Sequence, residues 1–409
     1  MKIINNAKTP QIRFDGFSDD WTEIKLGEVL IKNLEKNIGK IISNVESISN
    51  KYGFVKQSEY FDDRQIASKD TSNYYIIKKG AFAYNPSRIN VGSIAIKEND
   101  DISIVSPLYI SFYTKNELEN SFLWNWFKTS IFESSRQFFT NGGVRDTLSF
   151  DALSNISILI PSLPEQKKIG EFFNNLDNLI DAEQKKLDNL KQLKKGYLQQ
   201  LFPQDGEKFP RVRFPEFSDP WSIRKLSDFI ETSKEKNRKI KFSKQDVLSV
   251  SGEHGIVNQI QFKGRSFAGV SVAEYGVVNV GDIVYTKSPL KSNPYGIIKT
   301  NILSSGIVST LYAVYKPRLI TNSLFVQYYF ENDFRLNSYL EPLVNKGAKN
   351  DMKVSDDSAL MGDVIFPCRK EQDSIVAFFR NLDCLIDAEQ KKLDSLKAHK
   401  KGMLQKMFV

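Results

Sequence analysis

One long stretch occurs twice in this chain, and that duplication limits its possible folds more than any other feature. The first copy runs from Pro164 to Phe202 and the second from Lys370 to Phe408, 206 residues later; 26 of the 39 paired positions carry the same residue. Apolar residues recur in both copies at steps of three and four, the spacing of one face of an amphipathic helix. Each copy therefore predicts one helix of roughly 57 Å at 1.5 Å per residue.

An apolar stripe of this length needs more cover than a small domain supplies, and the other copy is the natural partner. We expect the two helices to pair as an antiparallel coiled coil, with the halves of the chain related by a pseudo-two-fold axis. The alternative, in which each helix packs only on its own domain, stays open. Residues expected in the packing are Ile169, Phe172, Phe173, Leu176, Ile180, Leu187, Leu190, Ile375, Phe378, Phe379, Leu382, Ile386, Leu393 and Leu396.

A second repeat precedes each helix. Arg13-Phe14, Phe17-Ser18-Asp19 and Trp21 recur 200 residues later as Arg213-Phe214, Phe217-Ser218-Asp219 and Trp221. A period this long indicates a duplicated domain, since repeats that stack into solenoids are far shorter. We expect a globular domain over residues 1–161, a long helix over 162–203, a second globular domain over 204–367 and a second long helix over 368–409.

The globular segments are rich in Ile, Val, Tyr and Phe and are interrupted by Gly, Asn and Pro, a composition typical of short strands. The fold class predicted is α+β, with mainly β domains followed by long helices. Expected strands are Tyr74–Ile77, Ala81–Tyr84, Ser93–Ile96, Ile102–Val105, Asp246–Val250, Val277–Val280, Asp282–Thr286 and Ser309–Val314; expected helices are Phe122–Phe139 and Leu324–Asn332.

Charge and composition narrow the class of partner. A net charge of +8 with an isoelectric point near 9.0 favours a polyanion. The two cysteines, Cys368 and Cys384, supply neither a disulfide framework nor a cysteine-rich zinc site. The first residues lack the apolar core of a signal peptide, and no apolar run reaches the ~18 residues that cross a bilayer. We expect a soluble, cytoplasmic protein that contacts no membrane.

Motifs for catalysis are weak. Asn293-Pro294-Tyr295 resembles part of the Asn-Pro-Pro-Tyr loop of amino-methyltransferases, but the second proline and a preceding Gly-rich cofactor turn are missing. Glu165-Gln166-Lys167 has the Glu-x-Lys spacing of nuclease metal sites, yet a solvated charged turn at a helix start is the favoured interpretation. The sequence contains no phosphate-binding Gly-Lys-[Ser/Thr] loop. His254 and His399 lack neighbours for a metal site or a catalytic triad. We expect neither catalytic nor metal-binding residues.

Polar loops after strands favour DNA contact instead. Arg and Lys side chains reach guanine edges or phosphates, and Asn pairs with adenine; glycine lets the backbone approach a phosphate closely. Two loops in each half have this composition: Tyr84–Gly92 and Thr140–Asp146 in the first half, and Tyr285–Gly296 and Asn345–Asp351 in the second. Ordinary solvated turns are the alternative. Candidate DNA-binding residues are Tyr84, Asn85, Arg88, Asn90, Asn141, Arg145, Lys287, Lys291, Asn293, Tyr295, Lys346 and Lys349.

The order of these segments resembles a known family. Each globular segment ends in an apolar strand and proline, followed by Glu-Gln and then Phe-Phe-x-Asn-Leu-Asp. The marks are Ile160-Pro161-Ser162-Leu163-Pro164-Glu165-Gln166 and Phe366-Pro367 with Glu371-Gln372. This pattern is similar to that of specificity subunits of type I restriction-modification systems. The second copy departs from it at Cys368-Arg369-Lys370, where Pro-Leu-Pro would be usual.

The resemblance implies a function and a set of partners. Each globular segment would be a target recognition domain that reads one half of a split, asymmetric site on double-stranded DNA. The helices would set the gap between half-sites and dock two modification (methyltransferase) subunits. Those subunits would use S-adenosylmethionine to methylate adenine, and motor/endonuclease subunits would use ATP and Mg²⁺. The chain itself would bind no cofactor and would not be an enzyme. Rival hypotheses are a stand-alone DNA methyltransferase or nuclease, and a coiled-coil scaffold that ignores DNA.

Overall fold

The computed structural model describes residues 8–60, 68, 70–140, 147–204, 206–290, 292–346 and 352–409. Its contacts divide the chain into two compact units, the first formed by Met1–Gln184 with Lys391–Val409 and the second by Lys185–Gln390. Each unit therefore contains one globular segment and a part of each long helix. The predicted four-part division into residues 1–161, 162–203, 204–367 and 368–409 groups the chain differently and stays a prediction.

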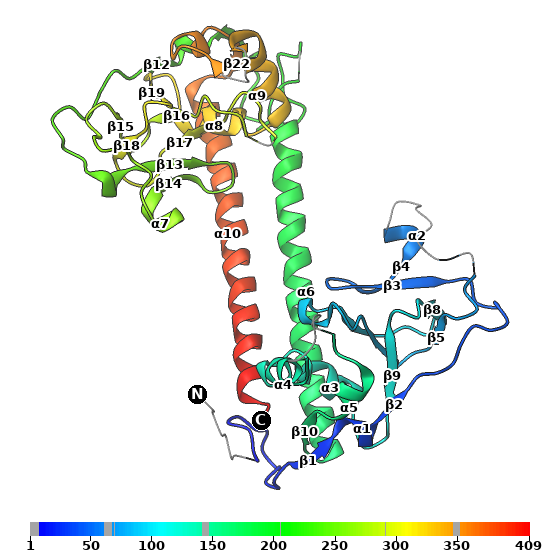
Figure 1. Ribbon diagram of the computed structural model, residues 1–409. Coiled ribbons are helices and arrows are strands. Elements are labelled where there is room, and N and C mark those ends of the chain that lie inside the picture. The colour runs from blue at the N-terminus through cyan, green and yellow to red at the C-terminus, as the bar shows by residue number, and fades with distance from the viewer. Residues whose placement is uncertain are drawn as a thin grey trace. The chain divides into compact units, whose positions relative to one another are not determined.

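Both long helices are present (Figure 1). α6 spans Leu163–Gln200 and α10 spans Arg369–Lys406, 38 residues each. Their bounds lie within a few residues of the predicted ones because the three- and four-residue period persists through the whole of each copy. The predicted fold class, α+β with mainly β domains and two long helices, is confirmed.

The first unit is built from antiparallel strands with one parallel pair. β3 and β8 are the parallel neighbours, and α3, α4 and α5 follow the strands. The three sheets are β1 (Thr22–Lys25) with β10 (Ser157–Ile160); β2 (Leu30–Lys32), β9 (Ile110–Thr114), β6 (Phe82–Tyr84) and β7 (Ile94–Ile96); and β4 (Gly53–Lys56), β3 (Val45–Ser49), β8 (Ser103–Val105) and β5 (Tyr75–Ile77). The helices are α1 (Leu26–Val29), α2 (Gln57–Tyr60), the 3-10 turn η1 (Ile89–Val91), α3 (Asn120–Trp126), α4 (Ser130–Thr140) and α5 (Phe150–Ser154).

The second unit repeats this order of elements. Its strand groups are β11 (Ser222–Lys225) with β22 (Asp363–Phe366); β12 (Ile230–Thr232), β19 (Ala313–Pro317), β16 (Ile283–Tyr285) and β17 (Ile298–Thr300); β13 (Leu248–Ser251) with β14 (Gly255–Asn258); β15 (Gly276–Val278) with β18 (Gly306–Val308); and β20 (Asn345–Lys346) with β21 (Met352–Lys353). Its helices are η2 (Leu226–Asp228), η3 (Lys244–Asp246), α7 (Gln259–Lys263), α8 (Ser323–Tyr329), α9 (Asp333–Leu340), η4 (Glu341–Leu343) and η5 (Ser358–Leu360). The duplication therefore extends to the fold of the globular segments.

Two predicted elements were wrong in extent. Phe122–Phe139 is two helices, α3 and α4, because Thr129 interrupts it: its Oγ1 donates to the Trp126 carbonyl at 2.7 Å and accepts from Phe132 N at 3.3 Å. The predicted strand Ser309–Val314 begins too early: Tyr312 N donates to the Ser309 carbonyl at 3.0 Å in a turn, and the strand, β19, begins at Ala313.

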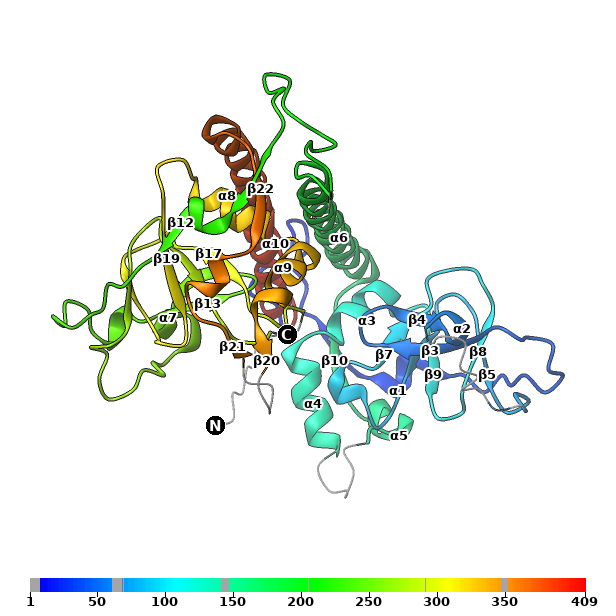
Figure 2. The ribbon, with the colours of Figure 1, turned by 90° about the horizontal axis from the view of Figure 1, so that it is seen from above.

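The start of each long helix packs on the globular part of its own unit (Figure 2). In the second unit α8 lies beside α10, where the Tyr328 ring stacks on Phe379 at 4.9 Å. In the first unit α3 lies beside α6, where Glu119 N donates to Gln166 Oε1 at 2.8 Å. The alternative considered from the sequence, packing of a helix on its own domain, therefore applies to these first turns.

The far end of each long helix enters the other globular core. Phe202, just after α6, packs on Trp221, Phe325 and Phe379 in the second unit. Phe408, just after α10, packs on Trp21, Phe122 and Phe173 in the first unit. Both phenylalanines are at most 4 % exposed. The C-terminal residues thus complete the core of the N-terminal globular segment.

Candidate nucleic-acid interface

The first predicted loop of the first unit is a tight turn after β6. Asn85 Oδ1 accepts from Ser87 N at 3.0 Å, and Arg88 N donates to the Asn85 carbonyl at 3.0 Å. η1 follows and ends at Gly92, whose φ of +84° is the left-handed conformation that glycine adopts readily. Arg88 and Asn90 are exposed on this turn. The turn after β6 therefore exposes the guanidinium of Arg88 and the side-chain amide of Asn90.

Tyr84, predicted as a DNA contact, lies in the core beneath this loop. Its side chain is fully buried, and its hydroxyl donates to the Leu148 carbonyl at 3.1 Å. Burial raises the pKa of this phenol well above its ordinary value. The ring completes the core under the loop, because a tyrosine at a strand end is as suited to packing as to recognition.

Tyr84 nevertheless connects the two predicted loops of the first unit. Leu148 lies just after the second loop, and Leu148 N donates to the Pro86 carbonyl at 3.1 Å. The base of the first loop and the exit of the second are therefore hydrogen-bonded neighbours. Asn141 and Arg145, predicted in the second loop, lie outside the described residues.

The corresponding loop of the second unit, Tyr285–Gly296, is pinned by its own side chains. Lys287 adopts a left-handed φ of +48°, and its Nζ lies 2.7 Å from Asp356 Oδ1. Asn293 and Tyr295, predicted as DNA contacts, are buried in the structure. Asn293 Nδ2 donates to Asp333 Oδ1 at 2.9 Å, and the Tyr295 hydroxyl donates to Glu341 Oε1 at 3.0 Å.

In the second unit, too, the segment after the second predicted loop contacts the first loop. Asp356 lies shortly after the second loop and binds Lys287 of the first, and its carbonyl accepts from the Tyr315 hydroxyl at 2.9 Å. The backbone of Lys346 lies in β20, where it pairs with Met352. Lys291 and Lys349 lie outside the described residues.

A buried ion pair joins the start of each long helix to the segment before the first strand. Arg13 binds both carboxylate oxygens of Glu165 at 2.7 and 2.8 Å, and Arg213 binds those of Glu371 at 2.8 Å. The bond to Glu371 raises the pKa of Arg213. The favoured interpretation of Glu165 as part of a solvated turn was wrong, because Glu165 is buried and binds Arg13, 152 residues away in the chain.

The glutamine after each of these glutamates locks the same junction. Gln166 donates to the carbonyls of Pro161 and Glu117, and Gln372 donates to those of Pro367 and Ile320. Both glutamines are at most 1 % exposed. The repeated Glu-Gln pair is therefore structural: it fixes the angle at which each helix leaves its globular segment.

We expect Arg213→Met to lower the free energy of unfolding of the second unit by about 2–3 kcal/mol. A buried carboxylate without its partner costs about 3–5 kcal/mol, and partial exposure of Arg213, at 14 %, reduces this because water reaches the site. Adding Glu371→Gln should recover part of the loss, since no buried charge then stays unpaired. Urea unfolding of both variants measures this, and additive losses in the double variant would contradict it.

The long helices run antiparallel within each unit, and their ion pairs repeat. In the first unit Lys392 binds Glu183 and Lys400 binds Asp177. In the second unit Lys186 binds Glu389 and Lys194 binds Asp383. Each pair of the second unit is that of the first with the roles of the two copies exchanged, 206 residues apart. The ion pairs of the two units thus use the same repeated positions of the two helices.

Residues predicted to pack between the helices fall into three groups. Ile169, Phe173, Ile375 and Phe379 belong to the cores of the globular parts, with Phe172 and Phe378 against them. Leu176, Leu187, Leu382 and Leu393 are buried further along the helices. Ile180, Leu190, Ile386 and Leu396 are half-buried. One part of each apolar stripe is therefore covered by a globular core, and another part by the facing helix.

The described residues contain neither a cluster of metal ligands nor a helix that could span a membrane. No three His, Cys, Asp or Glu side chains among them come close enough together to hold a metal ion. None of the helices in the described parts of the chain is both long and apolar enough to span a membrane. Cys368 and Cys384 are exposed and free.

The known proteins that this chain resembles are specificity subunits of type I restriction enzymes. Residues 18–192 match the model of the type I restriction modification DNA specificity domain. The chain is 22 % identical over 417 residues, 94 % of its length and 92 % of the relative's, to the putative type I restriction enzyme MjaX specificity subunit of Methanocaldococcus jannaschii. It is 24 % identical over 219 residues, 52 % of its length and 50 % of the relative's, to the MjaVIII specificity subunit of the same organism.

Two solved structures share the fold. The type I restriction-modification system S subunit from M. genitalium aligns with a TM-score of 0.57 at 13 % identity, covering 98 % of this chain and 99 % of that one. A chain from a study of complex assembly and conformational transition of a type I system aligns with a TM-score of 0.53 at 14 % identity, covering 95 % and 97 %. The chain therefore resembles the specificity subunits of type I restriction-modification systems: residues 18–192 match their DNA specificity domain, and the fold is that of a solved S subunit.

Proposed function

We propose that the chain reads a bipartite, asymmetric target on double-stranded DNA through two target recognition domains, and directs adenine methylation and cleavage by partner subunits. One observation carries the proposal: in each unit a residue shortly after the second candidate loop binds the first loop, Leu148 to Pro86 in the first unit and Asp356 to Lys287 in the second. This arrangement would bring the two polar loops of each unit to one surface.

The two surfaces differ in chemistry, which supports an asymmetric target. The first unit presents Arg88 and Asn90 on its turn, whereas the second presents a lysine-rich loop whose Lys287 is held by Asp356. An arginine bound to guanine and an asparagine bound to adenine read base edges, while lysines mainly bind phosphates. Different residues on one duplicated fold would read different half-sites.

The long helices are the proposed link to the catalytic partners. We propose that α6 and α10 serve as the spacer between the half-sites and dock two modification subunits, because the same helix surface occurs once in each copy. S-adenosylmethionine would then be bound by the modification subunits, and ATP and Mg²⁺ by motor/endonuclease subunits. Catalysis would reside wholly in these partners.

Arg88→Gln is expected to change recognition without loss of assembly. One good base contact is worth about 1–3 kcal/mol, so methylation of the original target by the assembled complex should fall about 5- to 150-fold. Lys25→Gln is the matched control, because it removes an exposed cation of the same unit from strand β1. Equal methylation by both variants and by the unsubstituted complex would remove Arg88 from the interface.

The function itself is tested with the chain assembled with its modification subunits. A gel shift on duplex DNA at several salt concentrations, followed by mapping of methylated adenines, should give salt-sensitive binding and a split, asymmetric methylation pattern. Failure of the complex to bind DNA would favour the protein scaffold. Methylation or cutting by the purified chain alone would establish the stand-alone enzyme instead.

A further inference from the structure

Two loops at equivalent places in the units share one internal structure. We name them the Asn37 loop, residues 33–42, and the Asn237 loop, residues 233–242. Asn37 Nδ2 donates to the Ile42 carbonyl at 2.9 Å and its Oδ1 accepts from Ile42 N at 3.2 Å; Asn237 binds Phe242 in the same two ways at 2.8 and 3.0 Å. Both asparagines are 2 % exposed. Each loop is therefore closed at its base by one buried amide.

The same backbone conformation recurs inside both loops. Lys40 has a φ of +53° and Ile240 a φ of +49°, and each N–H donates to the carbonyl of the clamping asparagine, at 2.9 and 2.8 Å. A positive φ is unfavourable for a β-branched residue such as isoleucine. Such a conformation persists only where the surroundings impose it. The loops are thus preformed supports rather than adaptable turns.

The side chains that these supports display have opposite chemistry. The Asn237 loop carries five cations, Lys234, Lys236, Arg238, Lys239 and Lys241, against one carboxylate, Glu235. The Asn37 loop carries two cations, Lys36 and Lys40, against Glu35, and it exposes Ile38 at 78 % and Ile41 at 90 %. One support is therefore strongly basic and the other largely apolar.

The two loops also differ in how many of their cations have a partner. In the Asn37 loop Lys40 is paired with Asp70 at 3.2 Å, and Lys36 is hydrogen-bonded to Asn73 at 3.5 Å. In the Asn237 loop only Arg238 has a carboxylate partner within the described residues, Glu274 at 3.1 Å. No carboxylate in that part of the chain lies within 4.0 Å of the Nζ atoms of Lys234, Lys236, Lys239 or Lys241. Four lysines are thus available to an anion.

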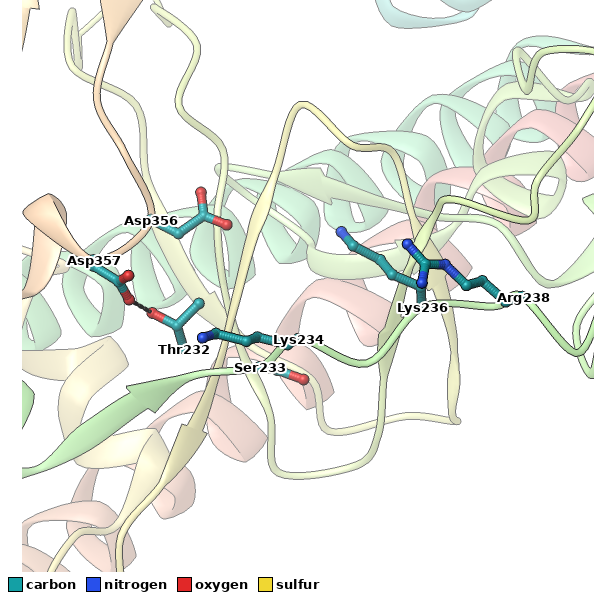
Figure 3. Close-up of a pocket in the computed structure, with 7 residues that line it drawn as sticks. All are labelled: Thr232, Ser233, Lys234, Lys236, Arg238, Asp356 and Asp357. Carbon is teal, nitrogen blue, oxygen red and sulfur yellow. Dashed lines mark hydrogen bonds between the residues drawn. The ribbon is translucent and has the colours of Figure 1, made fainter.

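A pocket of about 410 Å³ lies at the start of the Asn237 loop (Figure 3). Lys234, Lys236 and Arg238 line it from the loop, and Asp356 and Asp357 line it from the facing segment. These two carboxylates are engaged: Asp356 binds Lys287 at 2.7 Å, and Asp357 accepts from the Thr232 hydroxyl at 2.6 Å. Since Lys287 belongs to the predicted recognition loop, the pocket adjoins the proposed interface.

We propose that the Asn237 loop binds the DNA phosphate backbone through Lys234 and Lys236, and that the Asn37 loop has no such role. This inference rests on the proposed function and adds an inequality to it: the second recognition domain supplies more of the salt-dependent affinity than the first. Phosphate binding needs unpaired cations on a fixed backbone, and among the described residues only the Asn237 loop of the two supplies them.

The test compares two matched double variants in the chain assembled with its modification subunits. Binding to a duplex carrying the target is measured over a series of salt concentrations. Each phosphate contact contributes about 0.9 to the slope of log K against log salt, so Lys234→Gln with Lys236→Gln should reduce the slope by about 1.8. Lys36→Gln with Lys40→Gln removes the same charge from the Asn37 loop and should change the slope by less than about 0.5.

A charge-preserving variant separates electrostatics from folding. Lys234→Arg with Lys236→Arg should keep the slope of the unsubstituted complex, because the clamp at Asn237 is untouched. An unchanged slope in the glutamine pair at 234 and 236 would overturn the inference while leaving the proposed function standing. Equal losses from both loops would overturn the inequality. A complex that binds no DNA before any substitution would overturn the proposed function instead.

Discussion

Phe408→Ala is expected to open the first unit and leave the second folded. Phe408 is 4 % exposed, and its ring centroid lies 5.1 Å from that of Phe122, 6.0 Å from Phe173 and 6.5 Å from Trp21. Truncating a buried phenylalanine to alanine costs about 3–5 kcal/mol, because contacts are lost and a cavity remains. The loss should appear in residues nearly 400 positions upstream, since Phe408 packs beside Trp21.

The matched variant is Phe202→Ala, which removes the equivalent ring from the core around Trp221 and Phe325. Hydrogen exchange followed by peptide mapping should show faster exchange in β1 and β10 for Phe408→Ala, and in β11 and β22 for Phe202→Ala. Each variant thus controls for the other. The prediction fails if Phe408→Ala leaves the exchange of β1 unchanged or opens β11 to the same extent.

The long helices were the part of the fold that the sequence predicted best. A three- and four-residue apolar period over 38 residues cannot be satisfied by a strand, and the duplication supplied the partner. The long helix predicted for 162–203 is observed over Leu163–Gln200. The packing of Phe202 and Phe408 in the globular cores was not predicted, because the two residues only continue the three- and four-residue spacing of the apolar stripe.

Short strands were predicted least well. β2 and β12 have three residues each, too few to show an alternating pattern, and both form by pairing with strands more than 70 residues later, β9 and β19. Their existence depends on tertiary contacts rather than on local propensity. For the same reason β2 and β12 are absent from the predicted strands.

The candidate site was predicted as loops but not as residues. Tyr84, Asn293 and Tyr295 have the chemistry of DNA contacts, yet they close the loops from inside, and composition does not distinguish the two roles. The Asn237 loop was missed although a signal existed: Glu35-Lys36-Asn37 recurs as Glu235-Lys236-Asn237, 200 residues later. Asn37 and Asn237 are the same buried residue in both halves, although the residues around them differ. Such a repeat within one chain indicates a loop conformation that both halves have kept.

Leu187→Asp is expected to have the other large effect, by separating the helices of the second unit. Leu187 is 1 % exposed on a helix whose neighbouring positions are mostly polar, so its cover comes from another element. The adjacent pair Lys186–Glu389 identifies that element as α10. An aspartate there loses about 2–3 kcal/mol of apolar burial and also places a carboxylate where it finds no partner, so the total should exceed about 4 kcal/mol.

Leu193→Asp is the matched control, because it makes the same substitution on the same helix at a position that is 48 % exposed. Circular dichroism during urea unfolding should show loss of helix at much lower urea for Leu187→Asp, whereas Leu193→Asp should stay within about 0.5 kcal/mol of the unsubstituted chain. Leu393→Asp, the equivalent change in the first unit, should behave like Leu187→Asp. A Leu187→Asp chain that unfolds at the same urea concentration as the control would show that the stripe is held by its own globular core alone, and the paired-helix arrangement would have to be abandoned.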